Sequence, residues 1–504
     1  MTENASPESF ITLLKGHGQP GRPSTWGALK TGAAVLLLCA ATAIASSAQT
    51  FTDLLSFDGT DGSFPYAGLV QGADGNLYGT TYNGGTYGYG TVFEISAAGK
   101  LTTLYNFCPG EICTDGMNPN AGLVQATNGN FYGTTLYGGP NGDGNIFEIT
   151  PAGKLTSIYL FCPQVSTCPD GSSPYAGLVQ ASNGRLYGAT TTGGNNNLEN
   201  CSGGCGTIFD VSLTGTLTTL YSFCSVINSQ GYCADGMYPF SAAVQAADGN
   251  FYGTTQLGGA YNQGTFFEMT TAGKLTTLYS FCAQVNGHGY CANGSHPSPA
   301  PVQAANGNFY GTTYYGGVGN AGTVFEMTPA GELTRLYSFC YQPDCTGGST
   351  ASLIQASDGN LYGTAAGQIF KITLGGKLTT LYSPDDAQGE ILNGLVQGTD
   401  GMLYGTSAYG GSSYDGTIFS FAVGLRPFVE TRPASGKVGS GIVILGNSLK
   451  STTGVSFNGT AATFTVVSAT EIKTNVPVGA TSGTVQVTTA TGQLSSNVPF
   501  RVEP

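Results

Sequence analysis

The chain has 504 residues, 79 of them Gly, and only 9% of its residues are charged, with a formal net charge of -13. Residues 51–424 hold 7 Lys and Arg against 24 Asp and Glu, whereas residues 425–504 hold 6 against 3. An acidic surface repels phosphate backbones and anionic lipids, so nucleic acid and membrane surfaces are not expected partners. Helical periodicity is nearly absent, and the composition favours short strands and tight turns.

Residues 1–48 have the layout of a secretory signal peptide. Lys15, Arg22 and Lys30 precede an apolar run from Ala33 to Ala45, which small residues follow up to Ala48. The run is too short to span a bilayer, so we expect cleavage after Ala48 and no membrane insertion of the mature chain. The layout predicts a secreted or cell-surface protein.

The cysteines after residue 48 fall into close pairs, as expected for local disulfides in an oxidising compartment. The six predicted pairs are Cys108–Cys113, Cys162–Cys168, Cys201–Cys205, Cys224–Cys233, Cys282–Cys291 and Cys340–Cys345.

One phrase, "ADGNLYGTT" at Ala73, recurs with small changes along the chain. The other copies begin at Thr127, Ser182, Ala247, Ala305, Ser357 and Thr399. Around each copy lie four short runs rich in β-branched and aromatic residues, such as "AGLVQGA", "NLYGTTY", "TVFEIS" and "KLTTLYNF" in the first unit. Four such runs per unit predict a four-stranded antiparallel sheet.

The first two runs of each unit are separated by Asp-Gly or Asn-Gly, as at Asp74-Gly75. These dipeptides favour the primed turns of β-hairpins, in which both central residues have positive φ. Metal ligation by the same Asp and Asn side chains is the alternative.

Seven such units predict an all-β, seven-bladed β-propeller over residues 49–424. The fourth run also occurs before the first unit, at Asp53–Phe57, and is missing after the seventh, which ends near Gly424. We therefore expect the N-terminal strand to complete blade seven and close the ring. An open solenoid of the same units is the alternative.

This closure makes "GLVQ" the innermost strand and gathers all variation in loop length on one face, together with the cysteine pairs. Tyrosines on that face would suit stacking on neutral sugars or docking of an extracellular protein. The alternative is that these rings only fill the space between blades. The candidate ligand-binding tyrosines are Tyr66, Tyr82, Tyr175, Tyr238 and Tyr314.

Two further positions recur with the symmetry. A ring of buried glutamines would tie neighbouring blades together, since each amide needs partners; these are Gln71, Gln125, Gln180, Gln245, Gln303, Gln355 and Gln397. The acids at the second position would do likewise or face the channel; they are Glu94, Glu148, Asp210, Glu268 and Glu326, replaced by Lys371 and Ser420 in the last two units.

Loop carboxylates are the remaining candidates for chemistry. Asp61, Asp115, Asp170 and Asp235 each precede Gly on the variable face. They are candidate ligand-binding residues, with calcium coordination or a plain Asx turn as the competing interpretations. His288 and His296 interleave with Cys282 and Cys291, but a disulfide explains that spacing better than zinc. We expect no catalytic residues, no metal and no required cofactor.

From about Arg426 the repeat gives way to "GKVGSGIVILGNSL", "GVSFNGTAATFTVVSATEIKTNVPVGATSGTVQVTT" and "SNVPFRV". These segments resemble the IPT/TIG immunoglobulin-like domain, which implies a β-sandwich over residues 425–504. Such domains in bacterial surface proteins are usually spacers or interaction modules.

Residues 51–424 resemble the Gloeo/Verruco-type tandem repeat family of exported bacterial proteins, through "DGNLYGTT", "GTVFEIT"-like and "GKLTTLYSF"-like phrases. The resemblance supplies no reaction and no catalytic residues. The "DGNLY" units are also distantly similar to virginiamycin B lyase-like propellers, whose expected catalytic histidine has no match here.

These observations favour a non-enzymatic scaffold that binds a glycan or an extracellular protein through the loop-rich face. The alternative is a propeller-fold polysaccharide lyase or glycosidase that uses loop carboxylates. The sequence does not define the oligomeric state.

Overall fold

The computed structural model describes residues 49–163, 168–195, 201, 203–339, 352–365, 367–383 and 392–503. The predicted signal peptide (residues 1–48) and the predicted pair Cys340–Cys345 lie outside these ranges. Within them, no helix has the length and apolar character needed to cross a membrane.

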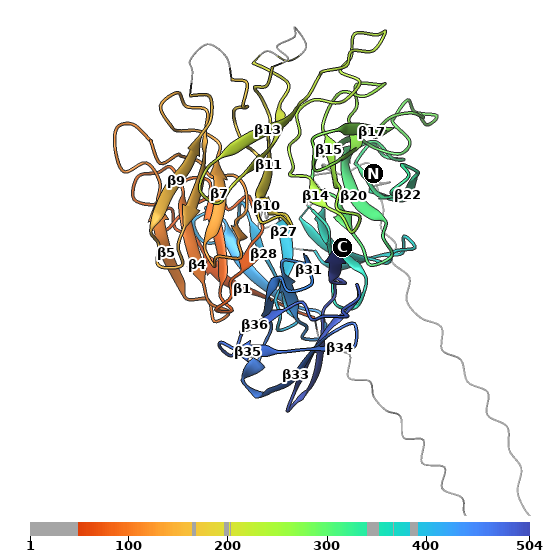
Figure 1. Cartoon of the computed structure of the whole chain (residues 1–504). Coiled ribbons are helices and arrows are strands. Elements are labelled where there is room, and N and C mark those ends of the chain that lie inside the picture. The colour runs from red at the N-terminus through yellow and green to blue at the C-terminus, as the bar shows by residue number, and fades with distance from the viewer. Residues whose placement is uncertain are drawn as a thin grey trace, which may run out of the picture. The chain divides into compact units, whose positions relative to one another are not determined.

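The repeat forms antiparallel sheets, which we call blades 1 to 7 in chain order (Figure 1). Blades 1 to 3 are β2–β5 (Val70–Gln71, Leu77–Thr81, Thr91–Ile95, Leu101–Asn106), β6–β9 (Val124–Gln125, Phe131–Thr135, Asn145–Ile149, Leu155–Leu160) and β10–β13 (Val179–Gln180, Leu186–Thr190, Thr207–Val211, Leu217–Ser222). Blades 4 to 6 are β14–β17 (Val244–Gln245, Phe251–Thr255, Thr265–Met269, Leu275–Ser280), β18–β22 (Ser295–Pro297, Val302–Gln303, Phe309–Tyr315, Thr323–Met327, Leu333–Ser338) and β23–β26 (Ile354–Gln355, Leu361–Ala365, Gln368–Ile372, Leu378–Tyr382).

Blade 7 contains both ends of the repeat. It is formed by β27 (Leu392–Gln397), β28 (Leu403–Ser407), β29 (Thr417–Ala422) and the N-terminal strand β1 (Thr50–Ser56). Strand β1 pairs antiparallel with β29, from Thr50 opposite Ala422 to Ser56 opposite Thr417. The predicted closure is therefore confirmed, and the open solenoid is not formed.

The second strand of each blade is buried on both faces because neighbouring blades pack against it. Tyr78 of blade 1 stacks on Phe131 of blade 2, with ring centroids 4.1 Å apart. Gly79 leaves room for the ring of Phe93 on the next strand, since a Cβ at Gly79 would lie 2.6 Å from that ring. The recurrent "LYGTT" phrase is thus the core of the blade.

The hairpin between the first two strands has a different turn from the one predicted. Gly75 has φ +91°, but Asp74 is not among the residues with positive φ, so the turn is not a primed type. Gly75 N–H donates to Gly72 O, and Gly72 N–H donates to Asn76 O. This is a type I turn followed by a left-handed Gly, in which only the Gly needs positive φ.

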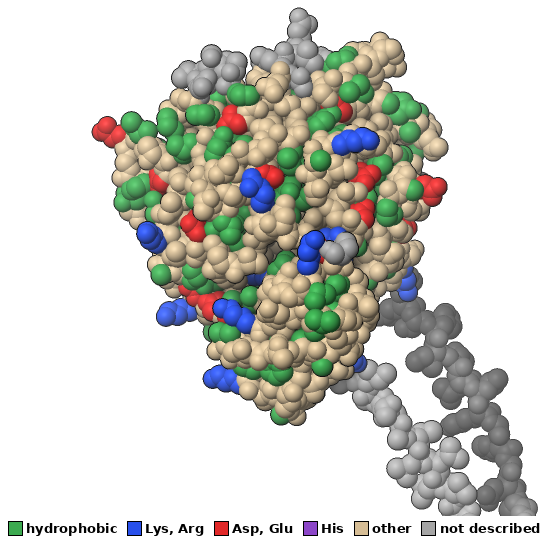
Figure 2. Space-filling view, in the orientation of Figure 1, with side chains coloured by type: hydrophobic (Ala, Val, Ile, Leu, Met, Phe, Trp, Pro, Cys, Tyr) green, Lys and Arg blue, Asp and Glu red, His purple; other side chains and the backbone are tan. Residues whose placement is uncertain are grey.

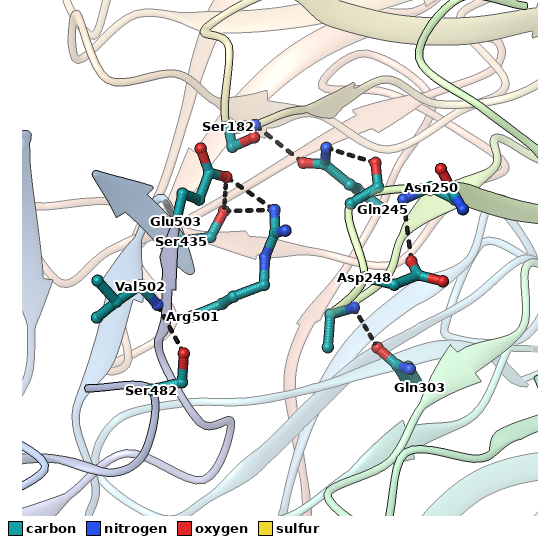
Figure 3. Close-up of polar contacts among 12 residues, drawn as sticks. Ser182, Gln245, Asp248, Asn250, Gln303, Ser435, Ser482, Arg501, Val502 and Glu503 are labelled. Atoms are coloured by element: carbon teal, nitrogen blue, oxygen red, sulfur yellow. Dashed lines mark hydrogen bonds and ion pairs between the residues drawn. The ribbon is translucent and has the colours of Figure 1, made fainter.

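The recurrent glutamines form a closed ring of links between blades, as predicted. Each side-chain oxygen accepts a backbone N–H from the preceding blade; for example, Ala73 donates to Gln125 at 3.0 Å and Ser182 donates to Gln245 at 2.9 Å. The last link joins Thr399 of blade 7 to Gln71 of blade 1 at 3.0 Å. Figure 3 shows the links that end on Gln245 and Gln303.

The recurrent acids take a different role from either of those predicted. Glu94 accepts a hydrogen bond from Asn76, and Glu148 accepts one from Asn130 and one from Tyr132, all within their own blades. These carboxylates therefore brace the hairpin turn of their own blade.

The C-terminal residues form an additional β domain. One sheet has the order β30 (Glu430–Arg432), β32 (Gly441–Leu445), β36 (Glu471–Asn475), β35 (Phe464–Val466), and another has the order β34 (Thr460–Ala462), β33 (Thr452–Phe457), β37 (Val485–Thr489), β38 (Gly492–Ser495). Strands β31 (Ser435–Lys437) and β39 (Arg501–Glu503) pair in parallel, and a 3-10 turn spans Leu449–Ser451. The buried core between the sheets includes Ile444, Phe457, Ile472 and Val487.

Candidate binding pocket on the loop-rich face

A pocket of about 580 Å³ lies where the segments that lead into the innermost strands meet. We call it the aromatic pocket. Its lining comes from all seven blades; the side chains larger than Ala are Tyr66, Asn120, Tyr175, Leu178, Val179, Phe240, Ser241, Ser298, Pro299, Tyr314, Ser352, Leu392, Asn393 and Tyr409. Among the described residues that line it, none is charged.

The residues that line the pocket stand at fixed distances in sequence before the recurrent glutamines. Five residues before the glutamine, the blades place Tyr66, Asn120, Tyr175, Phe240, Ser298 and Leu392 at the pocket. Three residues before it, they place only small residues: Gly68, Gly122, Gly177, Ala242, Ala300, Ser352 and Gly394. The pocket is therefore lined by large side chains at one level and by backbone and small side chains below.

The small residues let adjacent innermost strands approach closely. A Cβ at Gly68 would lie 3.2 Å from Gly394 O, and one at Gly122 would lie 3.1 Å from Gly68 O. Because these neighbouring strands lie so close together, side chains larger than those of Gly, Ala or Ser do not fit three residues before the glutamine.

Two aromatic groups face this pocket. Tyr66 and Tyr409 bring their hydroxyls to 3.3 Å, and the ring of Tyr82 lies edge-on to Tyr66 at 5.5 Å. Tyr175 and Phe240 form an edge-on pair at 5.0 Å. Burial, the largest cause, raises the pKa of the Tyr66, Tyr82 and Tyr175 phenols, so these hydroxyls stay protonated at neutral pH and remain hydrogen-bond donors.

Of the five predicted tyrosines, the structure brings Tyr66, Tyr175 and Tyr314 to the pocket lining and places Tyr82 against Tyr66. Tyr238 lies elsewhere: its N–H donates to Cys205 O, and its side chain packs on the core of blades 3 and 4. Sequence reasoning missed Phe240, although it stands at the same distance before its glutamine as Tyr66 and Tyr175.

The predicted aspartates do not converge on the pocket. Asp115 accepts Tyr105 Oη–H at 2.8 Å and Cys108 N–H at 3.1 Å. Asp170 accepts the equivalent Tyr159 and Cys162 donors, Asp235 accepts Tyr221 and Ser225, and Asp61 accepts Asp58 N–H. Each carboxylate thus braces a loop of its own, and no two of the four are brought together.

Five of the predicted disulfides are present: Cys108–Cys113, Cys162–Cys168, Cys201–Cys205, Cys224–Cys233 and Cys282–Cys291. Where Asp115 and Asp170 accept the N–H of Cys108 and Cys162, carboxylate and disulfide stiffen the same loop.

Two groups of residues with metal-ligating side chains lie close together within the described ranges. They are Cys201, Cys205, Cys224 and Cys233, and Asp143 with Cys162 and Cys168. All of these cysteines are joined in disulfides, which leaves the Asp143 carboxylate as the one conventional ligand.

The Gloeobacter/Verrucomicrobia repeat model matches the chain in four overlapping segments: residues 40–232, 112–293, 201–419 and 285–466. Together they cover most of the sequence. The chain belongs to this repeat family. A comparison with curated protein sequences gives no match.

Solved structures with the same kind of repeated sheets are distant from this family member. A streptogramin B lyase is 15% identical, with 74% of this chain and 97% of the other covered and a TM-score of 0.48. A catalytically inactive virginiamycin B lyase from Staphylococcus aureus, bound to quinupristin, is 16% identical (coverage 74% and 99%, TM-score 0.49). The extracellular domain of a putative hybrid two-component system from B. thetaiotaomicron is 12% identical (coverage 91% and 60%, TM-score 0.49).

Proposed function

We propose that this protein is an exported, seven-bladed propeller that binds a glycan in the aromatic pocket without chemically changing it. The observation that carries the proposal is a pocket of about 580 Å³ whose described lining combines Tyr, Phe and Asn with no charged side chain. Aromatic faces stack on the C–H surfaces of sugar rings, while phenol and amide groups bind sugar hydroxyls.

The proposed location rests on the predicted signal peptide and on the disulfides, which form in oxidising compartments. We propose that the C-terminal domain is the IPT/TIG immunoglobulin-like sandwich that its sequence resembles, with its two main sheets packed around one core. A glycosidase that uses loop carboxylates would need two of them at the reacting bond, and the described lining contributes none.

A glycan-array screen of residues 49–504 tests this proposal, using wild type and the Tyr66→Ala and Tyr175→Ala variants. We expect reproducible binding that each variant weakens at least tenfold. Tyr414→Ala is the matched control, because Tyr414 is 65% exposed and does not line the pocket. Binding of a protein but no glycan, or turnover of a bound glycan, would contradict the proposal.

A further inference from the structure

The end of the channel opposite the aromatic pocket is where the C-terminal domain meets the repeat. Thr470 Oγ1 donates to Ala73 O of blade 1 at 2.7 Å, and Arg432 Nη1 donates to Gln125 Oε1 of blade 2 at 3.1 Å. Asn497 Nδ2 lies 3.5 Å from Gln397 Oε1 of blade 7. All three contacts thus fall on or beside the glutamine ring.

The same domain also reaches the other side of the ring. Arg501 lies beside Gly249 of blade 4, where a Cβ would be 3.1 Å from Arg501 Nη1. Figure 3 shows Arg501 near Gln245 and Gln303, held by Ser435 and Glu503. A domain that contacts blades 1, 2, 4 and 7 at one end of the ring extends across that end.

With the C-terminal domain across that end, a ligand would enter the aromatic pocket only from the loop-rich end. The interior of a long polymer cannot pass through a closed channel, and it can only cross the surface above the pocket. A chain end can enter the pocket and bury its terminal rings against Tyr66, Tyr175 and Phe240. Because the described part of the lining holds no charged side chain, a carboxylate or sulfate on those rings would be desolvated there without an ionic partner.

Resting on the proposed function, we infer that the pocket binds the terminal sugar units of an uncharged oligosaccharide, and that the C-terminal domain closes the far end of the site. The ligand class is a neutral glycan with a free chain end. Polymers with charged sugars and the interior segments of polymers are excluded from the pocket.

Binding stoichiometry as a function of chain length tests the inference. The probes are hexasaccharides of cellulose, xylan, mannan and starch, together with soluble polymers of the same sugars, titrated by calorimetry. We expect a hexasaccharide and its polymer to bind with similar affinity and one protein per accessible chain end. Binding of more proteins to a polymer molecule than it has chain ends would overturn end recognition while leaving glycan binding intact.

Two further arms separate the remaining outcomes. In the first arm, the bound hexasaccharide is oxidised to an acid at one end or at the other. Oxidation of the end that enters the pocket should weaken binding at least tenfold. If both oxidised hexasaccharides bind as tightly as the neutral one, the inference is overturned. Ala300→Leu, which enlarges a small residue of the lining, should weaken binding tenfold, whereas Ala98→Leu on an exposed turn should not. If no neutral oligosaccharide binds at all, the proposed function and this inference fail together.

Discussion

At the residue scale, one tyrosine per blade couples the hairpin turn to the core. Where the turn holds Asp, the Tyr hydroxyl donates to it, as Tyr252 does to Asp248 at 2.8 Å. Where it holds Asn, the Asn amide donates to the Tyr hydroxyl. In blades 2 and 5 that hydroxyl then donates to the acid of the third strand, as Tyr310 does to Glu326 at 2.8 Å. The Asp/Asn alternation in the repeated phrase therefore changes the direction of the hydrogen bond between the turn residue and the Tyr hydroxyl.

The glycine of the "YG" pair is constrained by packing. In blade 4 a Cβ at Gly253 would lie 2.5 Å from Phe267 Cζ. We expect Gly253→Ala to reduce the free energy of unfolding by about 1–3 kcal/mol, because the ring must move within a packed core. Urea unfolding followed by tyrosine fluorescence measures the change.

Gly110→Ala is the matched control, since no atom lies within 4 Å of a Cβ built there. It should change stability by less than about 0.5 kcal/mol. Equal effects of the two substitutions would show that the ring of Phe267 does not limit the space at Gly253.

At the scale of elements, strand β1 decides whether blade 7 has an open edge. Phe57, at its end, is fully buried, and Phe51 stacks on Tyr382 of blade 6 at 4.0 Å. Without residues 49–57, β29 would present unpaired backbone groups. We expect this truncation to cost at least about 3 kcal/mol from the lost apolar burial and to promote aggregation.

Thermal unfolding and size-exclusion chromatography of residues 58–504 check this expectation. A synthetic peptide of residues 49–57, added in trans, should restore stability, and a scrambled peptide should not. A truncated chain as stable and monodisperse as the full chain would show that β1 does not hold the ring closed.

The glutamine links make a second kind of closure between elements. Gln71→Ala removes the acceptor for Thr399 N–H, which belongs to a residue only 1% exposed. An unpaired buried N–H costs about 1–3 kcal/mol, so we expect a loss of that size in chemical denaturation. Gln71→Glu keeps an acceptor oxygen there and should retain more of the stability than Gln71→Ala.

At the scale of the whole molecule, the sequence predicted the features that the sevenfold repetition makes visible. Strand number, the displaced strand β1, the glutamine links and five disulfides all follow from recurrence, spacing or parity. The turn type was wrong because Asp-Gly suits both a primed turn and a type I turn followed by a left-handed Gly. In a primed turn Asp and Gly are the two central residues, whereas here they are the third and fourth residues of a type I turn that begins at Gly72. The dipeptide alone does not encode which of these positions it occupies.

The pocket was predicted only in part, for a physical reason. Its chemistry depends on which side chains from different blades stand at one level of the channel, and loop lengths before that level vary. Counting back from the glutamine would have placed Phe240 beside Tyr175 and shown the ring of small residues. The contacts between the C-terminal domain and the repeat, such as Arg432 with Gln125, join residues far apart in sequence, so no local sequence pattern predicts them.

The buried tyrosine that recurs in each blade also makes the stability of the whole molecule depend on pH in the alkaline range. Burial, the largest cause, raises the pKa of Tyr132 and Tyr310 to about 12, and it raises the pKa of Tyr187, Tyr252 and Tyr404 as well. In the unfolded chain these phenols ionise near their usual pKa of about 10. The neutral, folded state therefore has its full advantage below pH 10, and the advantage is lost as the pH rises through about 12.

We accordingly expect the midpoint of thermal unfolding to be constant from pH 8 to about pH 9.5 and to fall steeply between about pH 10 and 12. Absorbance at 295 nm, recorded during the same titration, should show that these phenols ionise together with unfolding. Tyr132→Phe and Tyr310→Phe, combined, should lessen the slope, because each removes one phenol with a raised pKa, whereas Tyr414→Phe at an exposed site should not. Ionisation of all tyrosines near pH 10 in a chain that remains folded would contradict this account, since it would mean that the seven buried hydroxyls are open to solvent.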